Sequence, residues 1–241
     1  MVPQRHLHHF DGRSGKRDVH PALRQGMGRG AQSAVAVARG DRWRVMGELR
    51  IPLTAIASAV GEPMAADVLD GAADVAGVSI PGAPSVVIWR VRDDQLDHPQ
   101  QAYVGQWPDG RMQVLNDDQP AWTQLMDAAG VQIDDAATAL GYVRQFLEVT
   151  RGPMVNVRPI ERLEDVPWRP GSEDEEGRRE QFLRVPFEVP VSEPMGEMFQ
   201  VGLTLVVDQR IQRNSFEVSR DGRLSATFQV LAEDLPLPII R

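Results

Sequence analysis

The residues best suited to chemistry lie in one short segment, where three aspartates and a histidine follow an apolar run. Asp93, Asp94, Asp97 and His98 fall within six consecutive positions. Three carboxylates and an imidazole could hold a hard divalent cation, or one carboxylate could orient His98 as a general base. The alternative is an ordinary polar turn, which Pro99 favours. The weak candidates for catalysis are therefore Asp94, Asp97 and His98.

The rest of the chain offers few other reactive side chains. It has no cysteine, its single lysine is Lys16, and after His20 its only histidine is His98. Proteins draw most nucleophiles, Schiff-base amines and tunable bases from these three residue types. This composition favours a protein that is not an enzyme, with no cofactor and no assigned metal site. A carboxylate-dependent or metal-assisted hydrolase is kept as an alternative.

Large aromatic side chains and arginines indicate a second kind of site. On a curved sheet the aromatic faces could line a pocket, and an arginine could neutralise an anionic ligand. Ordinary core packing is the competing interpretation, because tryptophan is highly buried on average. The weak candidates for ligand binding are Trp89, Tyr103, Trp107, Arg90 and Arg158.

Several acidic pairs have simpler explanations than catalysis. Asp117-Asp118 and Asp134-Asp135 each precede a predicted helix, where a carboxylate caps free N–H groups and complements the helix dipole. Paired carboxylates can also hydrolyse glycosidic bonds, but sequence spacing gives no separation in space. The run Glu173-Asp174-Glu175-Glu176 predicts a solvated loop, or alternatively a docking site for a basic partner.

The first 46 residues differ in composition from the rest. Residues 1–50 carry ten basic and four acidic side chains, whereas the remainder carries 16 basic and 30 acidic ones. An acidic body repels phosphate backbones, so we expect it not to bind nucleic acid. The basic stretch has little apolar surface to bury and is predicted to be disordered. We therefore divide the chain into a leader, 1–46, and a single acidic α+β domain, 47–241.

Cellular location is predicted from what the sequence lacks. The absence of cysteine fits a reducing compartment, and no stretch approaches the roughly 20 apolar residues of a membrane span. Four of the five histidines lie in the leader, without the further ligands that would complete a closed metal site. Met1, Met27 and Met46 are all candidate start sites. We expect a soluble cytoplasmic protein with no membrane partner.

The elements that must position these residues begin near residue 51. Apolar spacing predicts two short helices, over 52–60 and 63–77, with a break near Gly61. β-branched residues predict a strand over 85–91.

A hairpin is predicted next along the chain. Its strands span 101–106 and 111–116, and its turn is Trp107-Pro108-Asp109-Gly110, whose proline, aspartate and glycine suit turn geometry.

Two helices with clear boundaries follow the hairpin. Pro120 marks the start of the first and Gly130 its end. Asp134 is expected to cap the second, which Arg151-Gly152-Pro153 ends. Tyr142 lies off the apolar stripe of this second helix, so it is expected to face solvent or a cleft.

The last third of the chain is predicted to be mostly strands, with Asp221-Gly222 as a hairpin turn. Strands and helices do not alternate, which argues against a doubly wound parallel sheet. We predict an α+β fold with the helix pair packed on one face of a curved antiparallel sheet, preceded by short helices and a β-hairpin. The strands are expected at 154–160, 181–191, 199–207, 214–219 and 223–230.

The order of elements over residues 120–240 resembles the cystatin-like cone, or its nuclear-transport-factor-2-like version. That resemblance implies a curved sheet only, and transfers no site residue.

Three functions from different classes follow from these patterns. The first is a non-catalytic interaction or accessory protein that acts through a sheet face or the acidic loop, with a protein partner or as a homodimer. The second is a small-molecule binding module with a pocket between the helix pair and the sheet. The third is the hydrolase that would use Asp94, Asp97 and His98.

Overall fold

The computed structural model divides the chain into two units, residues 1–40 and 41–241. The described residues all lie in the second unit and are 43–46, 49–96, 98–152, 157–169, 189–235 and 237. The predicted leader up to residue 42, Asp97 and the acidic run 173–176 lie outside them, whereas residues 43–46 of the predicted leader form a strand.

Two short strands and two short helices come first. β1 (Trp43–Met46) pairs with β2 (Leu49–Pro52), and α1 (Leu53–Val60) and α2 (Met64–Asp70) follow. The break at Gly61 is confirmed, because this residue has a φ of 68°. The prediction that the second helix continues to residue 77 is wrong. Gly71 ends α2 in the left-handed conformation, which a glycine adopts without steric penalty.

A four-stranded antiparallel sheet is built next, in the order β3-β4-β5-β6. The predicted hairpin between its last two strands is confirmed. Gly110 takes a φ of 84°, and the backbone N–H of Arg111 donates to Asp109 Oδ1 over 2.9 Å. The strands are β3 (Asp74–Val78), β4 (Val87–Asp93), β5 (Gln100–Gln106) and β6 (Met112–Val114).

The helix pair consists of α3 (Gln119–Ala129) and α4 (Ala136–Thr150). Asp118 caps α3 by accepting from the backbone N–H of Ala121 over 2.9 Å. The predicted cap of α4, Asp134, is wrong by one residue, since Asp135 accepts from the N–H of Thr138 over 2.7 Å. This bond is the main reason why the pKa of Asp135 is lowered.

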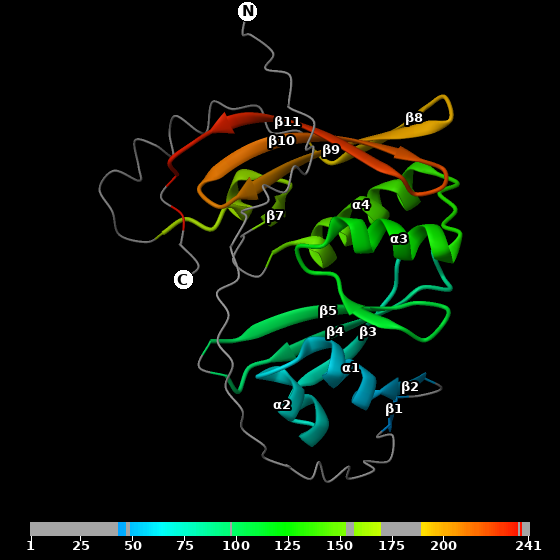
Figure 1. Ribbon diagram of the computed structural model, residues 1–241. Helices are drawn as coiled ribbons and strands as arrows, with labels where there is room; N and C mark the ends of the chain where they lie inside the picture. The colour runs from blue at the N-terminus through cyan, green and yellow to red at the C-terminus, as the bar shows by residue number, and fades with distance from the viewer. Residues whose placement is uncertain are drawn as a thin grey trace, which may run out of the picture. The chain divides into compact units, whose positions relative to one another are not determined.

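The remaining strands form a second antiparallel sheet of five strands, which is drawn in yellow to red in Figure 1. Its order is β11-β10-β9-β7, and β8 also pairs with β9. The Asp221-Gly222 turn is confirmed between its last two strands, and Gly222 has a φ of 81°. The strands are β7 (Val157–Ile160), β8 (Val191–Met195), β9 (Met198–Val207), β10 (Arg210–Ser219) and β11 (Leu224–Ala232), with a short 3-10 helix at Leu163–Asp165.

The helix pair packs between the two sheets, where one apolar core includes residues from α3, α4 and both sheets. A second core joins α1 and α2 to the opposite face of the four-stranded sheet, and a third lies on the opposite face of the five-stranded sheet, around Val206 and Ile211. The α+β prediction is confirmed, and the helix pair contacts two sheets rather than one. Among the described residues, no helix is long and apolar enough to cross a membrane.

Tyr142 corrects a detail of the predicted helix pair. The side chain is fully buried rather than facing solvent or a cleft. Its hydroxyl donates to the backbone carbonyl of Gly222 over 2.9 Å and accepts from Trp122 Nε1 over 3.3 Å. A tyrosine lying off the apolar stripe is tolerated here because both polar partners are present in the core.

Candidate functional site

The predicted catalytic segment follows β4 and is exposed. Asp94 forms an ion pair with Arg92 over 3.0 Å, and His98 faces solvent. Asp97 lies outside the described residues. No group of three or more metal-ligating side chains occurs in the part of the chain that the structure describes. The hydrolase function of these residues therefore stays a prediction.

Asp93 behaves differently from its neighbours in this segment. Its side chain is completely buried, and Oδ1 accepts from the backbone N–H of Gln95 over 2.9 Å. The half-buried Asp67 of α2 hydrogen-bonds to Asp93, and this bond is the largest cause of the raised pKa of Asp67, followed by burial. When Asp67 is protonated it can donate to Asp93, whose Oδ2 has no other donor among the described residues.

This pair of carboxyl groups was not predicted from the sequence, because its members lie on separate elements. A shared proton between two carboxyl groups is an arrangement that also occurs in aspartic proteases. Here, however, Asp93 has no exposed surface, so a substrate could not reach it without movement of α2. The interaction joins α2 to the end of β4.

The five predicted ligand-binding residues do not gather in one place. Trp89 faces the core of α1 and α2, whereas Tyr103 faces the helix pair. Arg90 lies opposite Tyr103 on the neighbouring strand, and Trp107 is buried at the hairpin, with Arg111 stacked 4.7 Å from its ring centroid. Arg158 is in β7, on the other sheet. Of the five, only Arg90 and Tyr103 lie opposite each other on neighbouring strands.

Tyr103 belongs to a polar network that sequence reasoning did not find. Its hydroxyl donates to Glu148 of α4, and Gln101 donates to that hydroxyl over 2.8 Å. Glu148 also accepts from Arg151 over 2.9 Å. Burial, and then the bond to Glu148, raise the pKa of Tyr103, so the phenol stays a proton donor rather than becoming a base. The network links β5 to the end of α4.

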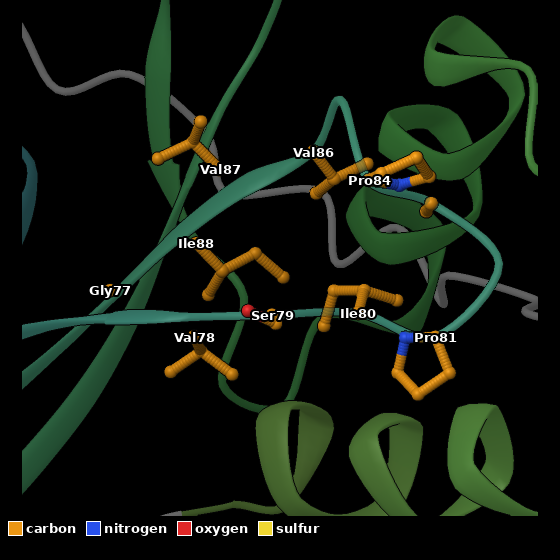
Figure 2. A pocket seen from close by; sticks show the side chains of 10 residues that line it. Gly77, Val78, Ser79, Ile80, Pro81, Pro84, Val86, Val87 and Ile88 are labelled. Carbon is orange, nitrogen blue, oxygen red and sulfur yellow. The ribbon is translucent and has the colours of Figure 1, made fainter. Parts of the chain in front are cut away.

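A hollow of about 540 Å³ lies beside the connection between β3 and β4. Ile80 and Ile88 lie close together in it, with Pro81 and Pro84 on the connecting loop (Figure 2). Ser79 provides its one hydroxyl. The volume would suit a small ligand, but such sites also need several converging polar groups to orient the ligand. None of the predicted ligand-binding residues is among those that line it.

One edge of β11 has no strand paired with it among the described residues. This nine-residue strand ends the order of the five-stranded sheet, and β10 pairs with its other edge. At the turn that joins β10 to β11, the backbone N–H of Ser219 donates to the carbonyl of Arg223. Hydrogen bonding alternates along an antiparallel pair, so the N–H and C=O groups of the even-numbered residues point away from β10. These residues are Leu224, Ala226, Phe228 and Val230.

The other outer strands of the four-stranded and five-stranded sheets carry features that hinder pairing. β3 has Asp74 and β6 has only three residues. β7 contains Pro159, and β8 contains Glu193 and Pro194. Short length, charge and proline are the usual means by which proteins block a sheet edge. β11 has the sequence LSATFQVLA, with no charge, proline or glycine.

Most side chains of β11 are exposed to solvent. Residues 225–229 are exposed, and Phe228 keeps 44% of its surface in contact with solvent. Phe228 lies opposite Asn214, on the side of the sheet that carries Leu203 and therefore faces the helix pair. A partner strand beside β11 would thus gain backbone hydrogen bonds and an apolar contact.

Comparison with known proteins finds no matching family model, no matching curated protein and no matching solved structure. Function must therefore be argued from the residues of this chain. The resemblance to the cystatin-like cone stays a prediction.

Proposed function

We propose that this protein is a non-catalytic interaction protein that binds other polypeptides by adding a strand to the edge of β11. The observation that carries this proposal is the nine-residue uncharged edge, beside outer strands that are short, charged or interrupted by proline. In strand addition, main-chain hydrogen bonds provide affinity and alternate side chains provide specificity.

The side-chain chemistry supports the same function. Asp93 is buried against Asp67, and Glu148 accepts hydrogen bonds from Tyr103 and Arg151. Asp118 and Asp135 cap helices. These five carboxylates have structural partners, which explains them without catalysis. We place the protein in the cytoplasm, as its lack of cysteine favours.

The test uses a labelled peptide with the sequence of residues 223–233 as the added strand. We expect the anisotropy of the peptide to rise when it is titrated with the intact protein at low concentration. Ala226→Pro should abolish binding, because proline removes an outward N–H while leaving the bonds between β10 and β11 in place. Ala226→Val is the matched control, since it changes the side chain and keeps the N–H.

The two variants must first show the same unfolding temperature as the wild type to within a few degrees. Equal peptide binding by Ala226→Pro and Ala226→Val would contradict the proposal. So would the absence of binding to the wild type.

A further inference from the structure

We infer that the strand added to β11 is β11 of a second copy of this chain, paired antiparallel about a two-fold axis at Phe228. This inference rests on the proposed function and names its partner. A two-fold axis perpendicular to the sheet keeps equivalent faces on the same side, so the five-stranded sheet continues through both copies.

The backbone geometry fits this pairing. Phe228 directs its N–H and C=O away from β10, so two copies can exchange both bonds across the axis. The N–H and C=O groups of Ala226 and Val230 also point away from β10. About this axis, Ala226 of one copy lies opposite Val230 of the other. The regular ladder with β10 extends through Val230, before a bulge at the end of the strand.

The charges at the two ends of β11 favour antiparallel over parallel pairing. Arg223, which forms an exposed ion pair with Asp221 over 3.3 Å, precedes the strand, and Glu233 follows it. Parallel pairing would bring like charges together, whereas antiparallel pairing brings unlike charges together. With the axis at Phe228, Arg223 lies near the end of the second copy's β11, which Glu233 follows.

The side chains agree with this register. Phe228 is the large exposed apolar residue of the strand, and the axis brings it against its own copy. Aromatic pairs across neighbouring strands stabilise a sheet, and burial removes apolar surface from water. The face that carries Thr227 and Gln229 is polar, so it can stay in contact with solvent.

The absence of cysteine makes a direct test straightforward. Single cysteines are introduced at Ala226, Thr227, Phe228 and Gln229, with Thr123→Cys on α3 as an exposed control, and oxidation to the disulfide-linked dimer is followed on non-reducing gels. Only a residue on the axis faces its own copy, at a Cα separation of about 5.5 Å that a disulfide can bridge. We expect Phe228→Cys to oxidise at least about tenfold faster than the others.

A maximum at another position, or equal rates at all five, would overturn the inference. Analytical ultracentrifugation of the cysteine-free chain provides an independent measurement, in which Ala226→Pro should sediment as a monomer and Ala226→Val as the wild type. If the wild type stays monomeric while the peptide still binds to it and not to Ala226→Pro, then the second copy is excluded and strand addition stands. If the peptide fails as well, the proposed function is excluded too.

Discussion

The two tyrosines of this chain provide a matched test of how its core is held together. Tyr142 is fully buried, and its hydroxyl links α4 to the turn at Gly222 and to Trp122. Tyr103 is also part of the core, but its hydroxyl contacts a network whose other members are partly exposed. Replacing each tyrosine by phenylalanine removes one oxygen and leaves the ring.

The expected cost differs between the two positions. In Tyr142→Phe, the carbonyl of Gly222 and the indole N–H of Trp122 both lose a partner inside the core. A buried group left unsatisfied costs about 1–3 kcal/mol, so we expect a loss of about 2–4 kcal/mol. In Tyr103→Phe, Glu148 keeps its bond to Arg151 and can recruit water. We expect a loss of only about 0.5–1.5 kcal/mol there.

The assay is urea unfolding followed by tryptophan fluorescence and circular dichroism. In thermal unfolding followed by the same two signals, Tyr142→Phe should lower the unfolding temperature by roughly 5–15 °C, from about 2–4 °C per kcal/mol for a protein of this size. Packing of the ring against Trp122, at a centroid distance of 5.6 Å, should survive in the variant. A loss in Tyr142→Phe that does not exceed the loss in Tyr103→Phe would refute this account of the core.

Two further predictions follow from single residues. The raised pKa of Asp67 means that the folded chain loses stability as the pH rises through that pKa. Asp67→Asn gives Asp93 a permanent donor. The free energy of unfolding in urea should therefore decrease less between about pH 4 and pH 8 in this variant than in the wild type. In Gly222→Ala the new Cβ would lie 2.9 Å from the hydroxyl of Tyr142, whereas in Gly110→Ala nothing lies within 4 Å. Both glycines have positive φ, so each variant should lose about 1–2 kcal/mol to backbone strain, and Gly222→Ala about 1–3 kcal/mol more. Equal melting temperatures for the two glycine variants would show that the turn yields to the added methyl group.

Elements whose ends are set by local residues were predicted well from the sequence. Gly130 ends α3 in the left-handed conformation, and the turns at Gly110 and Gly222 join the expected strands. In each case a glycine supplies a conformation that neighbouring residues resist. Gly71 ends α2 in the same way, although the apolar spacing continues beyond it and predicts a helix to residue 77.

Contacts between distant parts of the chain could not be predicted in this way. The bond from Tyr142 to Gly222 joins residues 80 positions apart, and the bond from Tyr103 to Glu148 joins residues 45 apart. Local periodicity shows which face of an element is apolar, but not which sheet that face will contact. For this reason the sequence predicts that the helix pair packs on one sheet, although it contacts two, and that Tyr142 faces solvent or a cleft, although it is buried.

The outward backbone groups of β11 support the proposed function in a way that the predicted reactive side chains do not. A side-chain carboxylate can turn toward a donor, as Asp118 does at a helix end and Glu148 does beside Tyr103. Backbone groups on an outer strand have no such freedom, because each residue adds an N–H and a C=O whose direction the ladder fixes. Along β11 no described strand meets the outward half of these groups, and no charge or proline protects them. We therefore expect binding by this chain to depend more on the backbone N–H and C=O groups that point away from β10 around Phe228 than on any single side chain.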